Sequence, residues 1–257
     1  MQELLEQYQQ VLSRMDRSRF PLADDKYSGV FLPVAFDEYR AADFRIMHVG
    51  RETSGWNTAN SKNTLGRIFS ANETGTTAAI VEEAVIRYEK HLDIRPDGTV
   101  ATTSKSRFKQ YYFRLAKEMS LPPKSIIYAN LFAWDYAGKS PLTSPAEELA
   151  AVSTVSLELL ALQVKFFKPH AIVFSTGYAG IDGMLKNMFS QHFNGHETVS
   201  VDPRKLWEFT VDDITCFRIA HPRASWGHGE YRTKVIERLH QLRSAGGTPI
   251  GQLEPAS

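Results

Sequence analysis

Two short segments of this chain place side chains capable of acid–base chemistry at the ends of apolar runs. The first, Val49–Trp56, carries the carboxylate of Glu52, and the second, Ala220–Trp226, carries the imidazole of His221. Each segment follows a run that is typical of a buried strand. Open α/β sheets bind their ligands at the carboxyl ends of strands, so Glu52 and His221 are candidate catalytic residues.

The spacing of apolar residues predicts strands that alternate with helices. Strands are expected at 43–49, 125–131, 171–175 and 214–220, with an edge strand at 205–210. Helices are expected at 3–16, 77–92, 106–119, 145–167, from Gly177 to about 190, and at 229–242, with a loop containing a short packed segment at 57–75. This alternation predicts an α/β fold of three layers, α/β/α, with a mostly parallel central sheet of about four to five strands.

The chain is long and apolar enough to form a substantial core. It has 257 residues, of which 42% are hydrophobic and 23% charged, and this composition argues against a disordered or fibrous protein. We expect a single α/β domain over residues 1–243, in which residues 1–42 form an N-terminal helical and loop extension. Residues 244–257 are rich in Gly, Pro and small side chains, and we expect a disordered tail there.

The charge and the N-terminal residues indicate the partners and the compartment. The net charge is +1, so a nucleic acid would meet a local basic patch rather than a wholly basic surface. The segment Met1–Glu6 is acidic and helical in pattern, unlike a secretory signal, and no stretch approaches the roughly 20 apolar residues of a membrane helix. We therefore expect a cytoplasmic monomer without a membrane contact.

Cysteine and histidine usage argues against a metal or a disulfide. The single cysteine, Cys216, excludes an intrachain disulfide and a four-thiolate cluster, and its apolar strand favours a packing role. His192 and His196 are separated by Asn194 and Gly195, which disfavour the helix that would aim both rings at one metal. The sequence also lacks a P-loop and the spacing of a dinucleotide-binding loop. We expect no metal and no cofactor.

Four segments, in chain order, resemble the uracil-DNA glycosylase superfamily. They are Gly50-Arg51-Glu52, Ile126–Asn130, Ile172–Gly177 and His221-Pro222, and the resemblance covers residues 43–240. In that family a first strand ends in a Gly-Gln-Asp-Pro-Tyr-like loop, a second in Asn, a third in an apolar run plus Gly, and a fourth in a His-Pro-Ser-like loop. The resemblance implies that family's fold and a monofunctional, cofactor-free enzyme. Such an enzyme flips a pyrimidine out of DNA, hydrolyses its N-glycosidic bond and leaves an abasic site.

Breaking an N-glycosidic bond needs two groups of opposite character, because positive charge develops on the sugar and negative charge on the departing base. A carboxylate on the first loop suits the sugar and the attacking water, and an imidazole on the last loop suits an oxygen of the base. The resemblance gives these roles to Glu52 and His221, and Glu52 stands where many members carry the shorter Asp. The alternative is that Glu52 caps a turn and His221 is a core histidine.

The resemblance also implies a pocket for the extruded base. Its residues would be Gly50, Arg51, Ser54, Phe69 and Asn130. Asn130 would read the base edge and Phe69 would stack on the ring, with a local turn bond and core packing as their alternatives. Members restricted to uracil carry a bulky Tyr where Ser54 stands, although Trp56 could refill the space. The base would be uracil or a C5-modified cytosine such as the glucosylated hydroxymethylcytosine of phages, in DNA repair or antiphage defence.

The last loop supplies the candidate DNA contacts. They are Arg223, Ser225, Trp226, His228 and Arg232. Trp226 would wedge into the duplex and the basic residues would meet phosphates, whereas burial of Trp226 beneath the last helix is the alternative. Three further cations alternate with aromatic residues and form a solvated helix face or, alternatively, a second backbone contact; they are Lys105, Arg107 and Lys109.

Two other function classes fit the same residues. A glycosidase acting on free nucleosides or nucleotides would need no wedge. A non-catalytic base-binding or DNA-binding module of the same fold would bind without releasing a base.

Overall fold

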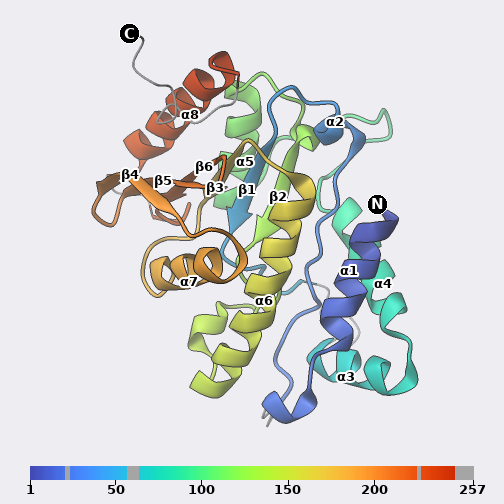
Figure 1. Cartoon of the computed structure of the whole chain (residues 1–257). Coiled ribbons are helices and arrows are strands. Elements are labelled where there is room, and N and C mark those ends of the chain that lie inside the picture. The colour runs from blue at the N-terminus through green and yellow to red at the C-terminus, as the bar shows by residue number, and fades with distance from the viewer. Residues whose placement is uncertain (21–23, 57–63, 225–226, 247–257) are drawn as a thin grey trace. The chain divides into compact units, whose positions relative to one another are not determined.

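The described residues form two compact units, each assembled from segments that are distant in the sequence. The structure is a computed structural model, and it describes the chain except for residues 21–23, 57–63, 225–226 and 247–257. Unit 1 comprises residues 1–34, 51–93 and 129–166, and unit 2 comprises residues 35–50, 94–128 and 167–257. Unit 2 contains most of the sheet, whereas unit 1 is mainly helical (Figure 1).

Eight α-helices and six strands lie in the described part of the chain. The helices are α1 (Gln2–Ser13), α2 (Asp37–Arg40), α3 (Thr64–Thr74), α4 (Thr77–Glu89), α5 (Arg107–Glu118), α6 (Ala146–Phe167), α7 (Asp182–His192) and α8 (Gly229–Ser244). The strands are β1 (Ile46–Gly50), β2 (Ile126–Asn130), β3 (Ala171–Phe174), β4 (Glu197–Asp202), β5 (Leu206–Val211) and β6 (Ile214–Ile219). Short 3-10 helices lie at Arg17–Arg19, Pro123–Ser125 and Pro141–Thr143.

The α/β class is confirmed, but the sheet is larger and less parallel than predicted. Its six strands have the order β2-β1-β3-β6-β5-β4. β1, β3 and β6 are parallel neighbours, whereas β5 and β4 pair antiparallel. Figure 1 draws β2 in the same direction as β1. The sheet is therefore mixed, with its parallel strands on the side that carries the predicted site segments.

Strand β4 accounts for the unpredicted edge of the sheet. Its side chains are almost all exposed, so it lacks the apolar run by which a strand is recognised in a sequence. The segment 205–210, predicted to be the edge, is β5 and pairs on both sides. Trp207 and Phe209 of β5 stack at 4.0 Å between ring centroids, and this packing explains why β5 is buried.

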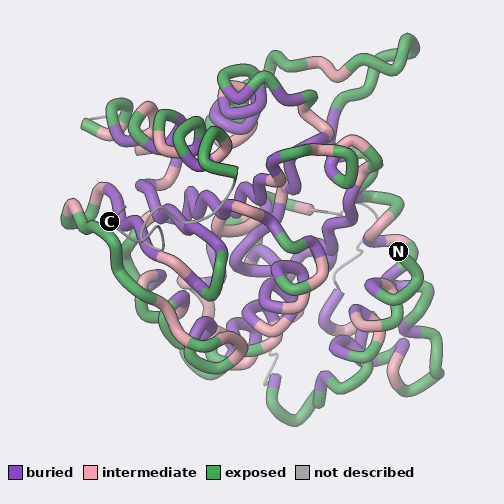
Figure 2. The backbone as a smooth tube through the Cα atoms, turned by 45° about the horizontal axis from the view of Figure 1, so that its top comes forward, coloured by how far each residue is buried: buried purple, intermediate pink, exposed green. Residues whose placement is uncertain are grey.

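Within unit 2, helices cover both faces of the sheet. His48 of β1 lies beside Val173 of β3 on one face, and its ring stacks on Phe108 of α5. Phe174 points to the other face, where it meets Phe189 of α7 at 6.1 Å. Figure 1 shows α5 and α7 on opposite sides of the strands, and Figure 2 shows the central strands buried. Cys216, also in the interior, has the packing environment that the sequence predicts.

One segment of unit 1 corrects a loop prediction. Residues 64–74 form helix α3, whereas the many Asn, Ser, Thr and Gly residues of 57–75 predict a loop. Leu65, Ile68 and Phe69 recur at helical spacing and are buried, so their packing outweighs the weak helix propensity of their polar neighbours. Residues 57–63 lie outside the described residues.

Helix α6 of unit 1 departs from the expectation that no stretch is apolar enough to cross a membrane. By length and composition alone it qualifies, but half of its most apolar window is buried within the protein. Glu148 accepts a hydrogen bond from Tyr27 at 2.9 Å, and Glu158 pairs with Arg14 at 2.5 Å. Glu148 is buried and Glu158 is partly exposed, so the helix has one face in the protein core and one face in solvent.

Candidate active site

In unit 1, a buried carboxylate holds the loop that carries Glu52. Oδ2 of Asp135 accepts hydrogen bonds from Thr53 Oγ1 at 2.7 Å, from the Gly55 amide at 2.8 Å and from the Trp56 amide at 3.2 Å. Oδ1 of Asp135 accepts from the Gly138 amide at 2.8 Å. Asp135 is fully buried, so these bonds are shielded from water. The hydrogen bonds to Asp135 therefore fix the backbone conformation of the loop after β1.

Glu52 itself is held by the residue before it. Arg51 Nε lies 2.7 Å from Glu52 Oε2 and Arg51 Nη2 lies 3.4 Å from Oε1, a two-point pairing. The side chain of Glu52 is 11% exposed, so water or a substrate atom reaches only a small part of the carboxylate. Arg51, predicted to bind the base, thus orients Glu52 in this conformation.

The remaining unit 1 candidates differ in their access to solvent. Ser54 is exposed and donates to the Gly138 carbonyl at 3.1 Å. Asn130 ends β2 and is 5% exposed. Phe69 is 3% exposed, and its ring meets Phe20 at 5.4 Å between centroids. The placement of Phe69 is that of the core-packing alternative, while Asn130 lies at a strand end and Ser54 in the loop after β1.

In unit 2, the loop after β6 fixes the orientation of His221. The Arg223 amide donates to Nδ1 of His221 at 3.2 Å, so Nδ1 acts as an acceptor and the ring proton belongs on Nε2. A neutral imidazole of this tautomer offers Nε2–H as a hydrogen-bond donor. His221 is therefore suited to stabilise a developing negative charge on an oxygen.

The loop after β3 packs closely against His221. Gly177 has φ +77°, and a Cβ placed there would lie 3.7 Å from the His221 amide nitrogen and 3.8 Å from its Cβ. The Gly177 amide donates to the Ile219 carbonyl at 3.1 Å, which ties the β3 loop to β6. A larger residue at Gly177 would strain the backbone beside the imidazole.

Arg232, a predicted DNA contact, also has contacts within the protein. Its Nη2 donates to the carbonyls of Pro222 at 3.1 Å and Ala224 at 2.8 Å. The half-buried guanidinium thus braces the His221 loop, and its predicted contact with phosphates stays a prediction. Arg223 is exposed and available for such a contact, and His228 precedes α8 at its N-cap. Ser225 and Trp226, including the predicted wedge, lie outside the described residues.

Unit 2 also contains a buried His–Ser pair that sequence reasoning missed. His48 Nε2 is 2.7 Å from Ser175 Oγ, and both residues are fully buried. Burial lowers the pKa of His48 to about 3, so the ring is neutral. Ser175 directly follows β3, and its amide donates to the Val49 carbonyl at 2.8 Å. The pair therefore fastens the ends of β1 and β3.

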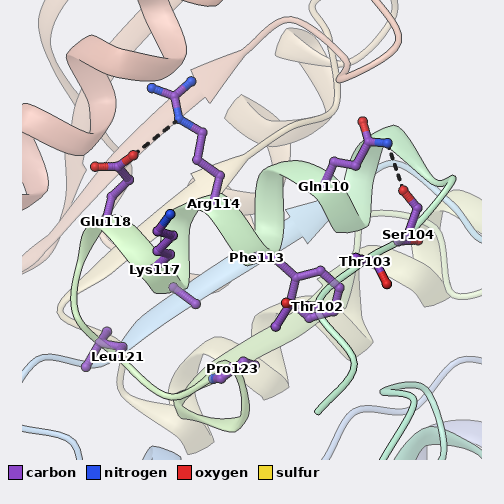
Figure 3. A pocket seen from close by; sticks show the side chains of 11 residues that line it. Thr102, Thr103, Ser104, Gln110, Phe113, Arg114, Lys117, Glu118, Leu121 and Pro123 are labelled. Carbon is purple, nitrogen blue, oxygen red and sulfur yellow. Dashed lines mark hydrogen bonds and ion pairs between the residues drawn. The ribbon is translucent and has the colours of Figure 1, made fainter.

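A cavity in unit 2 has a different lining from the predicted site. It is open to solvent and has a volume of about 670 Å³ between α5 and the segment 102–104. Figure 3 shows Phe113 pointing from α5 toward Thr102 and Pro123, while Arg114 turns toward Glu118. Of the described residues that line it, none belongs to the predicted catalytic, base-binding or DNA-binding set.

Comparison with known proteins does not assign this chain to a family. No family model matches the sequence, and no curated protein matches it. Among the described residues, no group of three or more His, Cys, Asp or Glu side chains is placed to hold a metal ion. The geometry of the residues themselves carries any assignment of function.

Proposed function

We propose that this protein is a DNA glycosylase that hydrolyses the N-glycosidic bond of a pyrimidine nucleotide and leaves an abasic site. The observation that carries the proposal is the strand order β2-β1-β3-β6. Asn130 ends β2, Glu52 follows β1, Gly177 follows β3 and His221 follows β6. Each of the four segments that resemble the uracil-DNA glycosylase superfamily thus contains or directly follows the carboxyl end of a strand, and such ends are where open α/β sheets bind ligands.

In the proposed reaction the bond from C1′ of the sugar to the base nitrogen breaks, and its electron pair leaves with the base. Nε2–H of His221 donates to a base oxygen as negative charge develops there. The carboxylate of Glu52 stabilises the cationic sugar and orients the water that bonds to C1′, and the proton that this water releases neutralises the departing base anion. Asn130 hydrogen-bonds the edge of the extruded base.

The base is proposed to be uracil or a C5-modified cytosine, including glucosylated hydroxymethylcytosine. Ser54 is exposed and small where uracil-restricted members of the superfamily carry a tyrosine, which supports a pocket for a substituted ring. Repair of DNA or defence against phages with modified DNA would be the setting. The protein would act as a cytoplasmic monomer on DNA, without a cofactor or a membrane contact.

The test is alkali cleavage of oligonucleotides after incubation with the protein. Single-stranded and duplex DNA would carry uracil, cytosine, hydroxymethylcytosine or its glucosylated form. We expect abasic sites with at least one of these bases, and a loss of about 100-fold to 1,000-fold in rate for Glu52→Gln and for His221→Ala. An exposed control, Asp97→Asn in the 96–98 turn, should cleave like the wild type.

The alternatives give different results in the same assay. A nucleoside or nucleotide glycosidase would release base from free nucleosides at a rate that DNA does not improve. A non-catalytic module would retain the oligonucleotide and leave every base attached. Unchanged cleavage in both active-site variants would contradict the assigned roles of Glu52 and His221.

A further inference from the structure

The first turn of α5 gathers cations and aromatic rings on one surface of unit 2. We call it the α5 surface; its residues are Lys105, Arg107, Phe108, Lys109 and Tyr128. Lys105 and Arg107 are exposed, and Phe108 and Tyr128 are half-buried. The first turn of α5 contains no acidic residue. The helix dipole disfavours cations at the N-terminal end of a helix. Lys105 and Arg107 therefore lower the stability of α5, and this cost favours a role for them in binding.

The two aromatic rings of the α5 surface contact each other, and one of them packs on a buried histidine. Phe108 and Tyr128 lie 4.6 Å apart between ring centroids at an angle of 38°. Phe108 stacks on fully buried His48 at 4.2 Å with the planes 6° apart. Because His48 is fixed by Ser175, the exposed part of the pair is pre-ordered, and a flat ligand would bind it at little conformational cost.

Positive charge accumulates where α5 meets α8. Arg114 Nη2 donates to Thr233 Oγ1 at 2.9 Å and so joins α5 to α8, while Arg114 Nε lies 3.9 Å from Glu118 Oε1. Burial is the largest cause of the lowered pKa of Arg232; Tyr111 opposes this shift, and the charges of Arg114 and Arg107 add smaller contributions to it. The charges of Arg107 and Arg114 thus act unfavourably on Arg232, although the whole chain carries a net charge of only +1. A polyanion would relieve this local repulsion.

The α5 surface is connected to the loop of His221 within the same unit. The Tyr111 hydroxyl of α5 donates to the Arg232 carbonyl at 3.4 Å, and the guanidinium of Arg232 lies 6.0 Å from the centre of the Tyr111 ring. Nη2 of the same Arg232 braces the loop at Pro222 and Ala224. Helix α5, whose first turn carries the α5 surface, is thus joined to the loop of His221, and we expect a strand whose target base reaches His221 to extend toward that turn.

We propose that the α5 surface binds unpaired nucleotides next to the target nucleotide, with a base stacked on Phe108 and Tyr128 and the flanking phosphates on Lys105 and Arg107. The inference rests on the proposed function, to which it adds a preference for single-stranded or locally opened DNA. Stacking on aromatic rings tolerates any base, so this contact adds affinity without sequence preference.

The test measures binding of a fluorescent single-stranded oligothymidine by anisotropy between 50 and 200 mM salt. This probe contains neither uracil nor modified cytosine, so binding is separated from base release. In the double variant Lys105→Gln/Arg107→Gln we expect the slope of log K against log salt to shrink by about 1.4, because about 0.7 is contributed by each lost phosphate contact. Tyr128→Ala should bind roughly tenfold more weakly, and Tyr128→Phe should bind like the wild type.

A matched double variant, Lys90→Gln/Lys117→Gln, removes two exposed cations away from the first turn of α5 and should keep the wild-type slope. Equal slopes in the two double variants, or unchanged binding by Tyr128→Ala, would overturn the inference. If base release persists with such a result, the proposed function stands and only the α5 surface is refuted. A wild-type protein that releases base from DNA but does not bind the probe would likewise refute the surface alone.

Discussion

Acid should destabilise this protein through His48, by about 1.4 kcal/mol for each pH unit below about 6.5. Burial lowers the pKa of His48 from 6.5 to about 3, so the unfolded chain binds a proton over a range in which the folded chain does not. Stability from the neutral ring is thus complete above pH 6.5 and falls as pH decreases toward 3. The full loss of about 5 kcal/mol is as large as the total stability of many domains.

Urea unfolding at pH 7.5, 6.0 and 4.5 measures this dependence. The double variant His48→Phe/Ser175→Ala keeps a ring against Phe108, leaves no unpaired hydroxyl at 175, and should have a flatter acid limb than the wild type. Ser175→Ala alone retains the imidazole and serves as the control, with the acid limb of the wild type. Parallel limbs in the double variant and its control would show that His48 is not the group that titrates.

Removal of the Asp135 carboxylate should unfold unit 1 more readily than any other single change that we predict there. Asp135→Ala leaves the Thr53 hydroxyl and the amides of Gly55, Trp56 and Gly138 without their acceptor. We expect a loss of about 4 kcal/mol in the free energy of unfolding, since buried donors that lose a charged partner keep their full desolvation cost. Thermal or urea unfolding monitored by tryptophan fluorescence would measure it.

Two further variants sharpen the Asp135 prediction. Asp135→Asn can keep an oxygen at the Oδ2 position, which serves three donors, so only the Gly138 amide loses its partner and the cost should be about 1 to 2 kcal/mol. Asp97 is an exposed carboxylate that accepts from the Thr99 amide at 2.9 Å, and Asp97→Ala should leave stability nearly unchanged. An Ala variant at 135 as stable as the one at 97 would contradict the anchoring role.

Continuous apolar runs and the helical spacing of apolar residues predict most of the strands and helices. The apolar runs that end at Gly50, Asn130 and Ile219 are strands, because burial on both faces selects continuous apolar sequence. The positions of Glu52 and His221 just past strand ends follow from the same runs. Strand β4 and helix α3 could not be predicted in this way, since β4 is exposed and α3 is surrounded by polar residues.

The contacts that could not be predicted join residues that are far apart in the sequence. Asp135 serves a loop 80 residues earlier, and His48 meets Ser175 127 residues later, so neither contact leaves a local pattern. A charged or titratable residue inside an apolar run was the available signal at both positions. Arginine is a residue type that often binds phosphate. Only the fold shows that Nη2 of Arg232 donates to two backbone carbonyls.

The most direct test of the proposed glycosylase is mass detection of free base released in a single turnover from DNA carrying each candidate pyrimidine. The wild type should release one base in amounts equal to the abasic sites formed, and Glu52→Gln and His221→Ala should release it about 100-fold or more slowly. DNA that stays bound to the wild type with every candidate base still attached would contradict the account and favour a non-catalytic binding module.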